Sequence, residues 1–180
     1  GDDPIGRHAV RRITDAAAHG RALSVLAARR EGYQPGDTDL AWTRLTPWRS
    51  MLAAALDQPF DTIENASVSA ERSNPSGPLL ASWLEQRLGV PVDLKAARAP
   101  GISGVRLRTA HGDIAITRPD GGVATLSRPG QPDSTVALAR RPLEALLAEE
   151  LRRLDADEVY GEALQAMALA PGRTTRDGEA

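Results

Sequence analysis

The sequence contains no cysteine, so no disulfide, thiolate metal ligand, cysteine nucleophile or thiol redox switch can form within the chain. Neither sign of charge is in large excess. The 22 lysine and arginine residues nearly balance 24 acidic ones and leave a formal net charge of −2. Such a balance argues against nucleic acid and against a membrane surface as partners.

Long hydrophobic runs are missing too. No apolar stretch approaches the ~20 residues that a membrane span requires, and no signal-peptide pattern opens the sequence, so we expect a cytoplasmic protein. The 180 residues are enough to bury one full core, and neither a repeat nor a linker divides them. We therefore predict a single α/β domain over residues 1–170 and a disordered polar tail at 171–180.

Aromatic residues are few, yet two of the three tryptophans lie close together in residues 37–52. Trp42 and Trp48 are interleaved there with Arg44 and Arg49. Apolar residues recur at three- and four-residue spacing, which predicts a helix with one buried face. Two interpretations follow. The stretch is either an amphipathic core helix with solvated arginines, which physical arguments favour, or an interaction epitope, because Trp and Arg most often anchor interfaces.

Local signals predict where this helix begins and how it is interrupted. Asp37 or Thr38 is suited to cap its first amides, and Asp39 suits the positive end of the helix dipole. Pro47 removes one hydrogen bond of the helix. The helix must therefore kink there, or restart with Thr46 as its cap and Pro47 in its first turn.

N-terminal helices are predicted on both sides of one ambiguous stretch. Acidic residues followed by proline indicate a helix start, which predicts a helix over residues 2–10. Residues 17–30 form a second helical pattern, ended by glycine and proline. Between them, residues 11–16 either continue the first helix or form a short strand.

A β-α-β unit and a meander are predicted next. Residues 66–72 and 92–94 fit strands on either side of a helix with a leucine-rich stripe at 79–88, which Gly89 ends. From residue 102 onwards, apolar and polar residues alternate in four short stretches separated by turn sequences. This pattern predicts a four-stranded antiparallel meander with one apolar and one polar face. The predicted fold class is α/β (α+β).

Two C-terminal helices are expected to complete the fold. The first carries a leucine stripe that we expect to pack on the apolar face of the meander. Residues 155–158 match a capping box with Asp155 as the cap, which predicts the second helix. Glu149 and Glu150, with the arginines that follow, are interpreted as a solvated helix face. The stripe consists of Leu143, Leu146, Leu147, Leu151 and Leu154.

The residue types indicate no catalytic site, no metal site and no cofactor site. The three histidines lack metal-ligand spacing, no serine lies in a nucleophile elbow, and no glycine-rich phosphate loop is present. Arg106, Arg108 and Arg118 remain candidates, because side chains on the polar face of the meander could receive an acidic partner or a phosphate. A solvated sheet face is the more common outcome of such a pattern.

Residues 39–49 read Asp-Leu-Ala-Trp-Thr-Arg-Leu-Thr-Pro-Trp-Arg. They resemble the D-L-x-W-x-R-L-x-x-W-R signature of the OpcA-type glucose-6-phosphate dehydrogenase assembly proteins. The likeness covers nearly all of the chain, and it favours a strand rather than a helix at residues 11–16. Its further stretches are 11–15, 75–92, 118–121, 138–141 and 147–160.

The resemblance implies a non-catalytic protein that binds glucose-6-phosphate dehydrogenase, promotes its active oligomer and activates it allosterically. Such a protein supports the oxidative pentose phosphate pathway and the supply of NADPH. Members of the family carry a further N-terminal α/β segment, which is absent before Asp2, so the strand at 11–16 is expected to lack sheet neighbours. Some members link activation to thioredoxin through cysteines, and this chain has none.

Two hypotheses for binding residues follow. In the first, Arg44 and Arg49, with the aromatic surface of Trp42 and Trp48 that stays uncovered, contribute to the surface that binds the dehydrogenase. In the second, the protein is a sugar-phosphate-binding sensor that uses the arginines of the sheet face.

Overall fold

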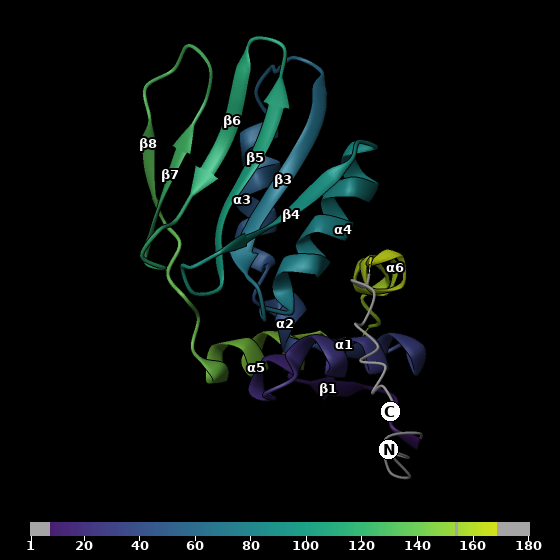
Figure 1. The fold of residues 1–180 in the computed structure, drawn as a ribbon. Helices are drawn as coiled ribbons and strands as arrows, with labels where there is room; N and C mark the ends of the chain where they lie inside the picture. Colours follow the sequence, from purple (N-terminus) through teal and green to yellow (C-terminus); the bar gives the residue numbers. More distant parts are fainter. Residues whose placement is uncertain (1–7, 154, 169–180) are drawn as a thin grey trace, which may run out of the picture.

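A six-stranded sheet is the largest element of the fold (Figure 1), and the computed structural model describes residues 8–153 and 155–168. The strands lie in the order β4-β3-β5-β6-β7-β8, and neighbours are antiparallel except β3 and β4. Both the four-stranded meander and the parallel β-α-β unit are thereby confirmed. The strands are β3 (Ile63–Glu71), β4 (Val92–Ala97), β5 (Ile102–Thr109), β6 (Gly112–Thr117), β7 (Val123–Ser127) and β8 (Ser134–Ala137).

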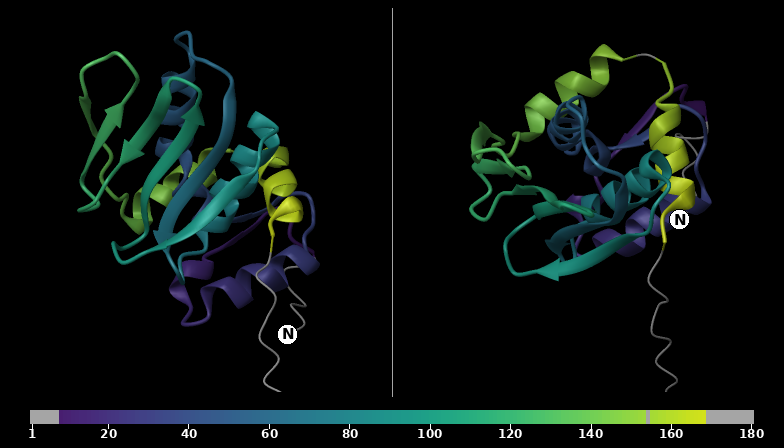
Figure 2. Two further views of the ribbon diagram at one scale, coloured as in Figure 1. Left: turned by 45° about the horizontal axis from the view of Figure 1, so that its top comes forward. Right: turned by 90° about the horizontal axis from the view of Figure 1, so that it is seen from above.

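One face of this sheet is buried and the other is open. Val68 of β3 lies opposite Val105 of β5, which lies opposite Ile116 of β6, and all three are almost fully buried. Two helices, α3 (Thr46–Leu56) and α4 (Ser76–Leu88), cover this apolar face, and Figure 2 shows them on the same side of the sheet. The opposite face carries polar residues, as the alternation predicted.

Gly89 ends α4 as the sequence predicted. Its φ angle is 66°, in the left-handed region, and its N–H donates to the carbonyl of Glu85 at 2.9 Å. Glycine adopts this conformation without the steric cost that a Cβ atom brings. The helix begins earlier than its leucine stripe indicated, at Ser76.

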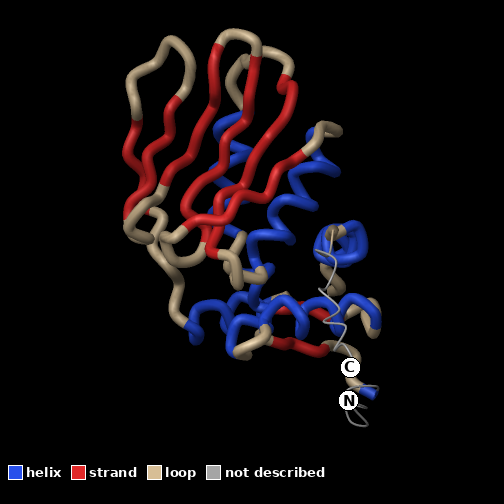
Figure 3. The backbone as a smooth tube through the Cα atoms, viewed as in Figure 1, coloured by secondary structure: helices blue, strands red, loops and turns tan. Residues whose placement is uncertain are grey.

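A second, two-stranded parallel sheet joins β1 (Arg12–Thr14) to β2 (Asp37–Asp39), and Figure 3 shows it apart from the large sheet. The strand expected at residues 11–16 is confirmed, and it has β2 as a neighbour. The caps expected at Asp37 and Thr38 are wrong, because parallel pairing with β1 extends these residues. Asp39 is the cap instead, and its carboxylate accepts from the N–H of Ala41 at 2.9 Å.

The N-terminal helices differ from the prediction. The helix expected over residues 17–30 is divided into a 3-10 helix, η2 (Ala16–Ala18), and α1 (Ala22–Glu31). The break occurs because His19 is extended and Gly20 follows it in a turn. Of the helix expected over residues 2–10, residues 2–7 lie outside the described part of the chain, and Val10 is not helical.

The tryptophan helix restarts at its proline rather than kinking. It consists of α2 (Leu40–Thr43) and α3, with Pro47 in the first turn of α3. Thr46 is the first residue of α3 and not its cap, and its hydroxyl donates instead to Glu149 at 2.7 Å. The end of α3 at Leu56 agrees with the prediction.

The C-terminal helices, α5 (Leu143–Arg152) and α6 (Glu158–Ala166), do not pack as predicted. Because α3 and α4 already cover the apolar face of the sheet, α5 contacts α2 and α6 contacts α4 (Figure 1). The prediction that the leucine stripe packs on the meander is therefore wrong, and Leu143 and Leu151 are exposed.

The cap of α6 is two residues later than predicted. Asp157, not Asp155, accepts from the N–H of Tyr160 at 2.9 Å. The tail predicted at residues 171–180, and Leu154 of the leucine stripe, lie outside the described residues.

Candidate functional site

The tryptophan segment, residues 39–49, is mostly internal. Trp42 is 1% exposed and Trp48 is 2% exposed, so neither ring offers a surface to a partner. The indole N–H of Trp42 donates to Asp157 at 2.9 Å, and its ring lies 5.9 Å from the ring of Tyr160. A buried indole N–H needs such an acceptor, because an unpaired one costs free energy. Both tryptophans thus follow the core interpretation.

The two arginines of the segment are half-buried rather than freely solvated. Arg44 donates two hydrogen bonds to the carboxylate of Asp15, at 2.7 and 2.8 Å. Burial raises the pKa of Asp15, but the hydrogen bonds and charge of Arg44 outweigh it, so this pKa lies below its ordinary value. The guanidinium of Arg49 lies over the ring of Trp42, 4.0 Å from its centroid, and burial lowers the pKa of this arginine.

The prediction of a solvated face at Glu149 and Glu150 is wrong. The carboxylate of Glu150, which is buried, accepts from the hydroxyl of Thr43 at 2.6 Å and from the guanidinium of Arg11. Glu149 accepts from the hydroxyl of Thr46 and from the guanidinium of Arg141, which precedes α5. This happens because α5 packs against α2, so its glutamates face the threonines of the tryptophan segment.

The three arginines expected on the polar sheet face do not lie together. Arg106 and Arg108 are exposed on the open face, where Arg106 is paired with Asp113. Arg118 lies on the opposite side. Successive side chains alternate between the two faces of the sheet, so Arg118, which follows the exposed Thr117, faces the core. It is 6% exposed, and its guanidinium lies 5.0 Å from the ring centroid of Trp48.

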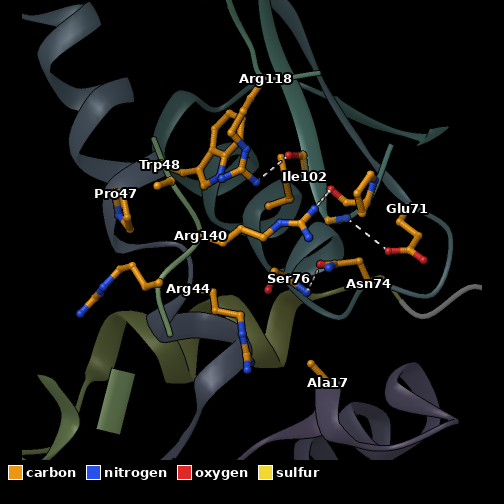
Figure 4. A pocket seen from close by; sticks show the side chains of 14 residues that line it. Ala17, Arg44, Pro47, Trp48, Glu71, Asn74, Ser76, Ile102, Arg118 and Arg140 are labelled. Carbon is orange, nitrogen blue, oxygen red and sulfur yellow. Dashed lines mark hydrogen bonds between the residues drawn. The ribbon is translucent and has the colours of Figure 1, made fainter. Parts of the chain in front are cut away.

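Arg118 lines a pocket of about 250 Å³ beside the tryptophan segment (Figure 4). Three further arginines line it, Arg44, Arg140 and Arg141, whereas Glu71 is the only carboxylate among the described lining residues. The sequence stretch 138–141 contributed to the family resemblance but was not predicted as a site. Its signal was a pair of arginines shortly after the end of a strand, which does not by itself show what the side chains face.

Within residues 8–153 and 155–168, no three metal-ligating side chains are grouped so that they could hold an ion. His111 lies in the turn where the sequence placed it, and its Nδ1 is 2.8 Å from a carboxylate oxygen of Asp61. This pair is exposed.

Comparison with solved structures found KijD10, a 3-ketoreductase from Actinomadura kijaniata, in two crystal structures with NADP and TDP-benzene. The first has a TM-score of 0.47 and 11% identity, and the match covers 85% of this chain and 65% of the ketoreductase. The second, an open conformation, has a TM-score of 0.47, 12% identity and coverage of 81% and 62%. This chain therefore spans less than two thirds of either ketoreductase. At these scores the likeness supports no functional conclusion.

Comparison with curated proteins found no match. Within the described residues, no helix has the length and apolar character needed to cross a membrane. Comparison with protein families matched residues 35–164 to OpcA_G6PD_C, the C-terminal domain of a glucose-6-phosphate dehydrogenase subunit. This match includes the whole tryptophan segment, the large sheet and most of α6, as the resemblance of residues 39–49 predicted. The chain belongs to this OpcA family of C-terminal domains from glucose-6-phosphate dehydrogenase subunits.

Proposed function

We propose that this protein is a non-catalytic, cytoplasmic assembly factor and allosteric activator that binds glucose-6-phosphate dehydrogenase and promotes its active oligomer. Through that enzyme it supports the oxidative pentose phosphate pathway and the supply of NADPH. The family match over residues 35–164 carries the proposal, because the family is described as a subunit of this dehydrogenase.

The use of charged groups in the tryptophan segment supports a binding role rather than a catalytic one. Catalysis needs a base, nucleophile or metal positioned at a reacting atom. In this segment the charged and hydroxyl groups of Asp39, Thr43, Arg44 and Thr46 make hydrogen bonds to other parts of the fold. They therefore hold the surface in shape.

Activation sets a thermodynamic requirement on this surface. A protein that binds the active and the inactive dehydrogenase equally well does not shift the equilibrium between the two forms, however tightly it binds. Moving a population from about 1:99 to 99:1 requires about 10⁴-fold tighter binding to the active form. The surface must therefore contact a part of the dehydrogenase that differs between its two forms.

Arg44 and Arg49 are the residues of the tryptophan segment that we assign to this surface. The side chain of Arg44 is 31% exposed although it is paired with Asp15, so part of its guanidinium can contact a partner. Trp42 and Trp48, because they are buried, act on the surface only by packing beneath it.

The proposal is tested by mixing the purified full chain with the dehydrogenase from the same cell. We expect the two to co-elute in size-exclusion chromatography at a larger size than either alone. We also expect the specific activity of the dehydrogenase to rise and to saturate as the chain is added. An unrelated protein at equal concentration controls for crowding. A dehydrogenase whose size and activity do not change would end the proposal.

The alternative function, a sugar-phosphate sensor on the open sheet face, has less support than the sequence indicated. Arg118 lies on the other side of the sheet, and Arg106 is already paired with Asp113. Only Arg108 is left there of the three predicted arginines. Substitution of Arg108 should therefore abolish sugar-phosphate binding if that face is the site.

A further inference from the structure

The geometry points to a second site, adjacent to the proposed dehydrogenase-binding surface, with which it shares Arg44. We propose that the pocket between the loop before β5 and the segment after β8 binds the phosphate group of a small phosphorylated metabolite. Its central residues are Arg118 and Arg140, with Asn74 and Gly101 beside them. The inference does not depend on dehydrogenase activation, because it concerns binding by this chain alone.

Three nitrogen donors converge on the space beside Gly101. This glycine has a φ angle of +70° and no side chain, and a carbon placed at its Cβ position would lie 3.6 Å from Nη2 of Arg140. The same point lies 3.8 Å from Nη2 of Arg118 and 3.8 Å from Nδ2 of Asn74. The amide of Asn74 is oriented by a hydrogen bond that its Oδ1 accepts from the N–H of Ser76 at 2.9 Å. Its NH₂ group therefore faces the pocket (Figure 4).

In the part of the chain that the structure describes, no carboxylate lies within ion-pair distance of the positive charge at this point, and only Asp120 acts on Arg118 from farther away. Arg118 is 6% exposed, and its two terminal nitrogens donate only to neutral carbonyls, of Leu138 at 2.8 Å and Ile102 at 2.9 Å. Its Nε has no hydrogen-bond partner there. Among the described residues, neither Arg118 nor Arg140 forms an ion pair with a carboxylate. A buried charge in this position is costly unless something pairs with it.

The two guanidinium groups also repel one another. Burial, followed by the charge of Arg140, lowers the pKa of Arg118. Arg140 is held in place by the carbonyl of Pro100, to which it donates at 2.6 Å. Gly121 has no side chain and therefore leaves room for the guanidinium of Arg140. A bound anion would relieve this repulsion. Arginine pairs are well suited to phosphate, because their planar forks match its oxygens.

The other charges of the pocket limit the ligand to a small anion. Arg44 and Arg141 are neutralised by Asp15 and Glu149. Glu71 stands at the rim, where it accepts from the N–H of Gly101 at 3.2 Å, and it would repel an extended polyanion. The volume of about 250 Å³ lies below the range of about 300–1,000 Å³ typical of drug-sized ligands.

The first N–H groups of α4 do not contribute to this site. The N–H of Ser76 donates to the side chain of Asn74, and the N–H of Gly77 donates to its carbonyl at 3.3 Å. Proline follows, which has no N–H. The arginines, rather than the helix end, carry the recognition.

Calorimetry on the full chain at low ionic strength tests the site with three probes: inorganic phosphate, glucose 6-phosphate and glucose. We expect heat from the two phosphate-bearing probes and none from glucose. Arg140→Gln should weaken binding at least tenfold, equivalent to about 1.4 kcal/mol. This side chain is exposed, so the variant should fold. Arg108→Gln removes the same charge from the opposite face and should change the affinity less than twofold.

The outcomes separate the sources of the phosphate group. Equal affinity for inorganic phosphate and glucose 6-phosphate indicates free phosphate as the ligand, whereas tighter binding of the sugar phosphate indicates a phosphorylated metabolite. The proposal is overturned if neither probe gives heat, if glucose binds equally well, or if both variants lose affinity equally. NMR gives a second readout: the Gly101 amide and the Trp48 indole should shift on addition of the probe, and Ser69 on the open face should not.

Discussion

Replacement of Glu150 by alanine tests whether a buried polar contact holds α5 against the tryptophan segment. The substitution leaves the hydroxyl of Thr43, which is 1% exposed, without its acceptor, and it leaves the guanidinium of Arg11 without its carboxylate. Breaking a buried ion pair on one side costs about 3–5 kcal/mol. An unsatisfied buried donor costs about 1–3 kcal/mol. Because the side chain of Arg11 keeps 14% exposure, we expect a loss of about 3–4 kcal/mol.

Urea denaturation followed by tryptophan fluorescence measures this loss. Glu162→Ala is the matched control: its side chain is 57% exposed and pairs with Arg87 at the surface, so it should cost less than about 1 kcal/mol. Glu150→Gln keeps an acceptor for Thr43 and should cost less than the alanine variant. A double-mutant cycle with Thr43→Val should give a coupling of at least about 0.5 kcal/mol. Equal, small losses for Glu150→Ala and Glu162→Ala would refute the buried contact.

Three further predictions concern the tryptophan segment, one tyrosine and one glycine. Replacing Arg44 and Arg49 together by alanine should lower stability by about 1–3 kcal/mol and weaken dehydrogenase activation. Full activation by a folded double variant, checked by circular dichroism, would remove both arginines from the binding surface. Burial raises the pKa of Tyr160, whereas in the unfolded chain this group titrates near its ordinary value of about 10. Its contribution to stability should therefore be complete below pH 10 and fall by up to about 1.4 kcal/mol per pH unit above it, which urea midpoints would detect and Tyr160→Phe would remove. In Gly89→Ala the added Cβ meets no atom within 4 Å, but the residue must keep a left-handed backbone. Calorimetric melting should therefore show a loss of stability of about 1 kcal/mol from strain alone.

The sequence predicted best what depends on one-sided burial. The alternation from Ile102 to Ile116 predicted the meander, because each strand has one buried and one open face. The leucine spacing before Gly89 predicted α4 for the same reason. In both stretches, neighbours along the chain determine which side chains face the core, and a periodic pattern records that directly.

What the sequence did not predict depends on contacts between distant segments. Asp37 has the chemistry of a helix cap, but pairing with a strand 25 residues earlier extends it. Glu150 has the pattern of a solvated charge, but its partners lie more than 100 residues away. Arg118 follows a predictable alternation, yet its place over Trp48 depends on how α3 crosses the sheet. Composition and spacing contain no information on such crossings.

The small parallel sheet has a consequence for where this domain can be cut. Ala16 donates its N–H to Asp39 at 3.0 Å, Asp15 pairs with Arg44, and Arg11 pairs with Glu150. All three N-terminal partners precede residue 35, where the match to the family's C-terminal domain begins. A fragment that begins at residue 35 would keep the charged side chains of Asp39, Arg44 and Glu150 but lose the N-terminal groups that pair with them. We therefore expect the folding unit to be longer than the matched residues 35–164, and expression trials should start upstream of Arg11.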